Sequence, residues 1–184
     1  MQIPFSPPKI SEEAIESVVE TLRCGWITTG PKTKAFEEAL TDYMGTEGTV
    51  AMNSATAALE MTLRLLGIGE GDEVITSAYT YTASASVIAH VGAKIVLVDT
   101  QKDSLEMDYT QLEEKITENT KAIIPVDIAG QLCDYDRLFE IARRKQALFH
   151  TENPVHALLN RIAIINDGAH SFGATKGENK SGRF

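Results

Sequence analysis

The stretch Glu73-Val-Ile-Thr76, followed by a helical pattern over Thr82–Val91 and then by Lys94-Ile-Val-Leu-Val98, decides the fold class. Both short runs are largely apolar, as in strands that are covered on both faces. One helix between two such strands is the connection that parallel strands need. The stretch therefore predicts a parallel β-sheet with helices packed on it.

The same alternation continues on both sides of this stretch. It predicts an α/β fold in three layers, a mostly parallel sheet with helices on both faces. Because such crossovers are right-handed, the carboxyl ends of the strands should meet along one edge, where ligands bind. Further strands are expected at Thr49–Met52, Lys121–Val126 and Ile162–Asn166, and further helices at Ser54–Leu66, Asp108–Glu118 and Asp134–Gln146.

Two amphipathic helices are expected before the sheet. The first begins at Ser11, ends at Gly25 and carries Ile15, Val18, Val19 and Leu22 on one face. The second covers Lys32–Met44, with Phe36, Ala39, Leu40 and Tyr43 pointing inward. We expect residues 1–48 to form an N-terminal helical segment and residues 49–184 a large domain with an insertion at about 147–160, in which Pro154 opens one helical turn.

Composition excludes several classes of protein. The 184 residues carry a net charge of −9 and no basic cluster longer than Arg143-Arg144-Lys145, which disfavours nucleic-acid binding. Apolar runs reach only four residues, such as Ile95-Val96-Leu97-Val98, too short to span a membrane. No secretory signal or metal-ligand spacing is visible, and Cys24 and Cys133 are expected to be free, buried thiols in a reducing cytoplasm.

Three features converge on the carboxyl edge of the predicted sheet. Small residues open a helix at Asn53-Ser-Ala-Thr-Ala57, where exposed N–H groups can bind an anion, although an ordinary cap by Asn53 or Ser54 explains them equally. Tyr79 and Tyr81 follow a strand, where they can stack on a flat ring or cap the core. Asp167 also ends a strand, as a site carboxylate or as a cap, and Asp99 and Asp127 do the same.

A phosphate cradle, a ring platform and a buried carboxylate together suit a phosphorylated aromatic cofactor with a basic ring nitrogen. Pyridoxal 5'-phosphate (PLP) fits, because a carboxylate keeps its ring nitrogen protonated.

At this point the sequence resembles the DegT/DnrJ/StrS family of PLP-dependent nucleotide-sugar aminotransferases, of the aspartate-aminotransferase fold type. The matching stretches occur in the family's order. They include Trp26-Ile-Thr-Thr-Gly-Pro31, Asn53-Ser-Ala-Thr-Ala-Ala-Leu59, Leu66-Gly-Ile-Gly-Glu-Gly-Asp-Glu-Val74, Tyr79-Thr-Tyr-Thr-Ala83 and Asp167-Gly-Ala-His-Ser-Phe-Gly173.

The resemblance implies roles for individual residues. The Ala55 and Thr56 amides and the Thr56 hydroxyl would bind the cofactor phosphate, and Tyr81 would stack on the ring. Asp167 would pair with the ring nitrogen and His170 would reach the phenolic oxygen. The loop with Trp26, Thr28 and Thr29 would bind substrate. Three positions depart from the family pattern: Ala55 replaces Gly, Asn166 replaces a common Glu, and Gly168 replaces a common Ala.

The family's catalytic lysine, which forms a Schiff base with the cofactor, is expected beyond Phe184. Lys176 and Lys180 lie in a polar, hairpin-like stretch and are interpreted as solvated turn residues. The chain is therefore expected to be the N-terminal part of a longer enzyme, and inactive alone.

The resemblance implies a homodimeric aminotransferase that moves an amino group, from glutamate, to a keto group of a nucleotide-linked deoxysugar, for surface polysaccharide or aminosugar biosynthesis. Two alternatives remain: a PLP-dependent sugar dehydratase of the same family, in which His replaces the lysine, and a non-catalytic remnant that binds nucleotide sugar or phosphate.

Overall fold

The computed structural model describes residues 7–184, and residues 1–6, where no secretory signal is predicted, lie outside the described part. The described chain divides into two compact units, one ending at Ala51 and one covering Met52–Phe184. None of the described helices is long and apolar enough to cross a membrane.

The N-terminal unit contains two helices, α1 (Glu12–Cys24) and α2 (Pro31–Met44). Helix α1 begins as predicted, because the Ser11 hydroxyl accepts a hydrogen bond from the Ala14 amide at 3.3 Å. It ends at Gly25, whose φ of 76° is the left-handed conformation that glycine adopts without strain. Both helix boundaries follow from local sequence.

The side chains of this unit are more exposed than predicted. Neither α1 nor α2 contains a buried residue, and Phe36 and Tyr43 are 55% and 47% exposed. The prediction that they point inward is therefore wrong, as is the prediction that Cys24 is buried. An amphipathic helix buries its apolar face only where another element packs on it, and neither helix has a buried residue here.

The second unit is built on a four-stranded parallel sheet in the order β2-β1-β3-β4. Val74 of β1 lies opposite Ile95 of β2 and Ala122 of β3. The pairing of β1 with β3 shifts by one residue between Glu73 and Val74, since Glu73 lies opposite Thr120. The strands are β1 (Glu73–Ser77), β2 (Lys94–Val98), β3 (Thr120–Ile124) and β4 (Ala163–Ile164).

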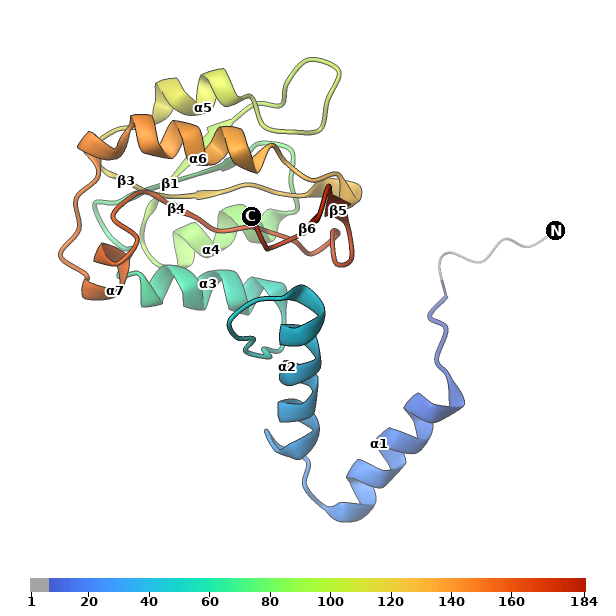
Figure 1. The fold of residues 1–184 in the computed structure, drawn as a ribbon. Helices are drawn as coiled ribbons and strands as arrows, with labels where there is room; N and C mark the ends of the chain where they lie inside the picture. Colours follow the sequence, from blue (N-terminus) through green and yellow to red (C-terminus); the bar gives the residue numbers. More distant parts are fainter. Residues whose placement is uncertain (1–6) are drawn as a thin grey trace. The chain divides into compact units, whose positions relative to one another are not determined.

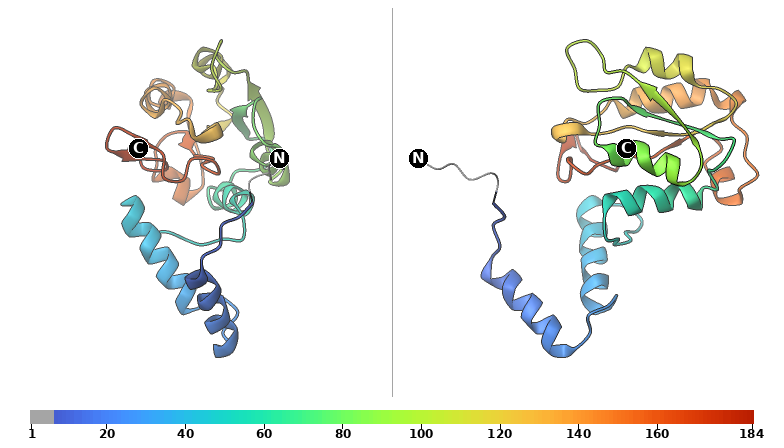
Figure 2. Two further views of the ribbon diagram at one scale, coloured as in Figure 1. Left: turned by 90° about the vertical axis from the view of Figure 1, so that its right-hand side faces the viewer. Right: turned by 180° about the vertical axis from the view of Figure 1, so that it is seen from behind.

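Helices cover this sheet on both faces, which confirms the predicted α/β class. Figure 1 shows α3 and α4 below the sheet and α5 and α6 above it, and Figure 2 shows the same layers from behind. The helices are α3 (Ala55–Leu65), α4 (Thr82–His90), α5 (Tyr109–Lys115) and α6 (Tyr135–Arg144).

Alternate residues of the central strands β1 and β3 enter different cores. Val74, Ala122 and Ile124 belong to the core under α3 and α4, whereas Ile75 and Ile123 belong to the core under α5 and α6. This is the period of two that an extended strand imposes on a sheet covered on both faces.

Two strand predictions need correction. Strand β2 lies at the edge of the sheet, and its Ile95 and Leu97 are 37% and 46% exposed, so it is not covered on both faces. Residues Thr49–Met52 form no strand, and Val50 is 77% exposed. An apolar run becomes a strand only where a partner strand accepts its hydrogen bonds, and among the described residues 49–52 have none.

The insertion lies at the amino ends of the strands. It contains a single helical turn, α7 (Pro154–Ala157), which begins at Pro154 as predicted and follows the 3₁₀ turn η2 (Gln146–Leu148). At the opposite edge of the sheet, after the 3₁₀ turn η1 (Ile128–Gly130), lies a small hairpin of β5 (Thr175–Lys176) and β6 (Asn179–Lys180) (Figure 1).

Candidate active site at the carboxyl edge of the sheet

The carboxyl edge collects the residues singled out in the second unit. Strands β1, β3 and β4 run in the same direction, so the segments that follow them emerge along one edge. Helix α3 runs back toward the start of β1, which brings its first turn to that edge as well. Parallel topology therefore gathers Thr56, Tyr81, Asp127 and Asp167 on one side of the sheet.

The first turn of α3 offers free N–H groups. Ser54 caps the helix, and its hydroxyl accepts from the Ala57 amide at 3.1 Å. The amides of Ala55 and Thr56 have no hydrogen-bond partner within residues 7–184, as expected for the first two positions of a helix. The cap that the sequence offered as an alternative is therefore present, and it leaves two donors available for an anion.

Tyr81 stands immediately before α4, with its side chain 77% exposed. Tyr79, two residues earlier, is 55% exposed. Neither ring caps the core, so the alternative interpretation of these aromatic residues is wrong. An exposed ring at a strand end is free to stack on a planar ligand.

Asp167 is buried, with 7% of its surface exposed. Its Oδ2 accepts a hydrogen bond from the Ser84 hydroxyl at 2.6 Å, and its Oδ1 accepts from the Ala169 amide at 3.3 Å. No ion pair involves Asp167 in the described part of the chain. A buried carboxylate without a cation is costly, and this one retains lone pairs for a further donor.

Ser84 connects two predicted site residues, although the sequence reasoning missed it. It is fully buried in the first turn of α4, and its amide donates to the Tyr81 carbonyl at 3.2 Å while its hydroxyl binds Asp167. Tyr81 and Asp167 are thus brought together through one residue. A small polar residue three positions after the aromatic one, on the inner side of the helix, was the available signal.

His170 lies in the turn that follows Asp167. Its Nδ1 accepts from the Ala129 amide at 3.3 Å, and the residue is exposed. Ala129 itself has a φ of 54°, an uncommon conformation for a residue other than glycine. The imidazole is therefore tied to the segment that follows β3, beside the Asp167 turn.

Asp127, at the end of β3, is a second carboxylate that the sequence did not distinguish from Asp167. It is fully buried. Its Oδ1 accepts from the Cys133 amide at 3.0 Å and the Tyr135 hydroxyl at 2.9 Å, and its Oδ2 from the hydroxyls of Ser171 at 3.0 Å and Ser181 at 3.2 Å. The two serine hydroxyls are also 2.6 Å from each other, so they act on Oδ2 as a hydrogen-bonded pair. These four partners satisfy the carboxylate, which identifies it as structural.

Two groups close to Asp127, the Cys133 thiol and the Tyr135 hydroxyl, are held in their neutral forms. Burial, and then the charge of Asp127, raise the pKa of the Cys133 thiol to about 12. Burial also raises the pKa of the Tyr135 hydroxyl well above its ordinary value, with the Asp127 charge as the second cause. Cys133 is therefore a neutral, unreactive thiol at physiological pH.

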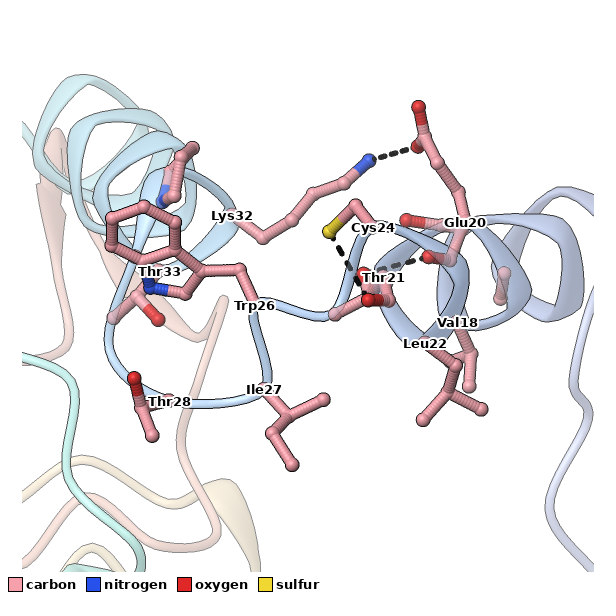
Figure 3. A pocket seen from close by; sticks show the side chains of 14 residues that line it. Val18, Glu20, Thr21, Leu22, Cys24, Trp26, Ile27, Thr28, Lys32 and Thr33 are labelled. Atoms are coloured by element: carbon pink, nitrogen blue, oxygen red, sulfur yellow. Dashed lines mark hydrogen bonds and ion pairs between the residues drawn. The ribbon is translucent and has the colours of Figure 1, made fainter.

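The three predicted substrate residues belong to the N-terminal unit. Trp26 closes the loop between α1 and α2, since its indole N–H donates to the Thr29 carbonyl at 3.1 Å and the ring covers Gly30. Beside this loop is a hollow of about 800 Å³ lined by Val18, Leu22, Trp26 and Thr28 among others (Figure 3).

Comparison with known proteins agrees with this geometry. The model of the DegT/DnrJ/EryC1/StrS aminotransferase family matches residues 8–184. The chain belongs to this family. Within residues 7–184 of this family member, no group of three or more His, Cys, Asp or Glu side chains could hold a metal ion.

Individual family members are similar over nearly the whole chain. The spore coat polysaccharide biosynthesis protein SpsC of Bacillus subtilis is 42% identical over 95% of the chain and 46% of its own length. The UDP-4-amino-4-deoxy-L-arabinose–oxoglutarate aminotransferase of Shewanella sediminis is 39% identical over 93% of the chain and 40% of its own length. The chain thus spans about half the length of the curated relatives it matches.

A solved structure is also closely similar. Spr1654 of Streptococcus pneumoniae, which has a provisional description as a sugar aminotransferase, superposes on the chain with a TM-score of 0.97 and 56% identity. The match covers 99% of this chain and 46% of Spr1654, and that protein is known in a PLP form as well as a PMP form.

In the described part of the chain, Lys176 and Lys180 lie on the β5–β6 hairpin, as the sequence predicted. Lys176 pairs with Asp134 at 3.6 Å, on the surface. The unusual Gly168 has a local explanation, because an added Cβ would come within 3.2 Å of the Ser171 hydroxyl and 3.4 Å of the Ser181 hydroxyl. An alanine at position 168 would therefore press its methyl group against the Ser171 and Ser181 hydroxyls that bind Asp127.

Proposed function

We propose that the complete gene product carrying this chain is a PLP-dependent aminotransferase that acts on a nucleotide-linked keto-deoxysugar. The single observation that carries the proposal is Asp167, a buried carboxylate that is oriented by Ser84 and has no cationic partner in the described chain. A protonated pyridine nitrogen is the partner that such a carboxylate suits, and PLP, when bound, supplies an electron sink for amino-group chemistry.

The residues present fit this cofactor at both ends. The unpartnered Ala55 and Thr56 amides, together with the Thr56 hydroxyl, would hold the phosphate at the positive end of the α3 dipole. Tyr81 would stack on one face of the ring, Asp167 would keep the ring nitrogen protonated, and His170 would donate to the phenolic oxygen. A methyl group at Ala55 narrows the phosphate cradle but leaves its amide free.

The remaining parts of the proposal concern substrate and assembly. Trp26, Thr28 and Thr29 would contact the nucleotide sugar, glutamate would donate the amino group, and the enzyme would be a cytoplasmic homodimer. The named activities of similar proteins, in polysaccharide and amino-sugar biosynthesis, support this substrate class. We propose that the 184 residues alone are inactive, because Lys176 and Lys180 both lie on the β5–β6 hairpin and neither is interpreted as the Schiff-base lysine.

The test uses the complete gene product. Added PLP should bind and give the visible absorption band of lysine-bound cofactor, which borohydride reduction removes, and glutamate should support amination of a keto-sugar nucleotide. Asp167→Ala should lower turnover at least about 100-fold, the range typical of a lost electrostatic partner, with an unchanged circular dichroism spectrum. Asp99→Ala, at another strand end but exposed, is the matched control.

Other outcomes would identify the alternatives. Loss of a sugar hydroxyl without amine transfer would establish the dehydratase. Binding of nucleotide sugar without PLP would establish the non-catalytic function. Full turnover by the Asp167→Ala protein would contradict the assigned site.

A further inference from the structure

The hydroxyl of Ser84 has an unambiguous hydrogen-bond direction. It lies 2.6 Å from Asp167 Oδ2 and 2.8 Å from the Thr80 hydroxyl. An ionised carboxylate only accepts, so Ser84 donates its single proton to Asp167. Thr80 must then donate to Ser84, and the three groups form one directed chain from Thr80 through Ser84 to Asp167.

This chain acts on one oxygen of Asp167. The Ser84–Asp167 distance of 2.6 Å lies in the range of charge-assisted O–H···O⁻ bonds. The second oxygen receives only the Ala169 amide, at 3.3 Å. Oδ2 is therefore held in place, the carboxylate plane is fixed, and the remaining lone pairs are left for a ligand.

The position of Ser84 makes it part of the site rather than of the general core. It is fully buried, in the first turn of α4, where the positive end of the helix dipole favours a carboxylate. The same turn begins at Tyr81, whose carbonyl accepts from the Ser84 amide at 3.2 Å. One helical turn thus carries both the exposed ring and the donor that orients Asp167.

We propose that Ser84 is a positioning residue for the proposed reaction, and that its hydroxyl, itself held by Thr80, fixes the Asp167 carboxylate toward the ring nitrogen of the cofactor. This inference rests on the proposed function. Ser84 touches neither substrate nor cofactor and acts only through Asp167.

The test compares Ser84→Ala with Ser86→Ala in the complete gene product. Ser86 lies in the same helix, and its hydroxyl makes only a local bond to the Ala83 carbonyl at 3.3 Å. We expect Ser84→Ala to lower kcat about 10- to 100-fold, the usual effect of losing a residue that orients a ligand, with little change in KM. Ser86→Ala should keep the parent value, and Ser84→Thr, which retains the hydroxyl, should restore most of it.

A second readout is independent of turnover. With ¹⁵N-labelled PLP bound, the chemical shift of the ring nitrogen reports its protonation. Ser84→Ala should move this shift toward the unprotonated value, and Ser86→Ala should leave it unchanged. Should Ser84→Ala fail to fold, Thr80→Val provides the same test, because it removes the donor to Ser84 and keeps the serine in place; a smaller shift in the same direction is expected.

The outcomes separate the two proposals. A parent protein that binds no PLP overturns the proposed function and this inference with it. A parent protein that binds PLP and is active, with Ser84→Ala or Thr80→Val identical to Ser86→Ala in kcat and ¹⁵N shift, overturns only the role of Ser84.

Discussion

The ends of β3 and β4 carry two buried aspartates in adjacent strands with different surroundings. Asp127 has four hydrogen-bond partners, two of them serine hydroxyls that also bond to each other, and Asp167 has two partners, one of them at 3.3 Å. The backbones of the two residues are paired, since the Asp127 amide donates to the Asp167 carbonyl at 3.1 Å. Burial at the carboxyl edge therefore does not distinguish the two carboxylates, whereas unused acceptor capacity does.

A third buried polar side chain lies at the opposite edge and extends the comparison. His156 of α7 is fully buried, and neither ring nitrogen has a hydrogen-bond partner among residues 7–184. Its ring contacts Phe149, with centroids 4.8 Å apart. Burial first, and then the Lys121 ammonium, lower the pKa of this imidazole, while the charge of Asp72 and the nearby backbone of Leu66 and Arg161 oppose the shift. Asp127 and Asp167 thus have four and two hydrogen-bond partners, whereas the His156 nitrogens make no hydrogen bond of normal length and angle within residues 7–184.

The largest expected effect is on Asp127. Asp127→Ala leaves the buried Cys133 amide and the Tyr135 hydroxyl without their acceptor, and it leaves the Ser171 and Ser181 hydroxyls with only each other. The free energy of unfolding should therefore fall by about 3 kcal/mol or more. Urea unfolding followed by circular dichroism measures it. Asp99→Ala, which removes an exposed strand-end carboxylate, should cost less than about 1 kcal/mol. Equal losses of free energy of unfolding in Asp127→Ala and Asp99→Ala would show that the hydrogen bonds to Asp127 contribute nothing to stability.

A smaller change in the free energy of unfolding, of opposite sign, is expected on replacing His156. His156→Leu removes a buried polar ring without partners and should raise the free energy of unfolding by about 1 kcal/mol at pH 8. The gain should grow on acidification. The folded state resists protonation at His156, whereas the unfolded chain accepts a proton as the pH falls below its ordinary pKa of 6.5, so the parent loses stability there.

Unfolding at pH 8, 6 and 5 measures this difference between parent and variant. His150→Leu, at an exposed histidine in the same insertion, is the control and should leave the free energy of unfolding nearly unchanged. A His156→Leu protein less stable than the parent at every pH would show that the imidazole has a hidden partner.

The smallest effect on stability is expected at Asp167. In Asp167→Asn the side-chain oxygen still accepts from Ser84, so the free energy of unfolding should change by less than about 1 kcal/mol. The same urea experiment measures it. A loss as large as that of Asp127→Ala would place Asp167 among the structural carboxylates and remove the contrast between the two strand ends.

The sequence predicted most of the elements of the second unit. Local signals set the caps at Ser54, Asp108 and Asp134, and the apolar runs set strands β1, β2 and β3. It failed where an apolar run needed a partner that local sequence does not specify. Val50 lies in an apolar, strand-like run, but no described strand pairs with it. Phe36 lies in an amphipathic helix, but its side chain stays 55% exposed.

The sequence by itself determined the alternation of strands and helices, and so the edge at which ligand-binding residues meet, because periodicity and capping are local properties of the chain. Only the tertiary structure decided which strand-end aspartates are buried, and which of the two buried ones, Asp127 or Asp167, keeps free acceptor capacity. Hydrogen-bond partners such as Ser84 for Asp167 and Ser181 for Asp127 lie 83 and 54 residues away along the chain. The folded backbone, rather than any local pattern, determines which of these distant groups meet.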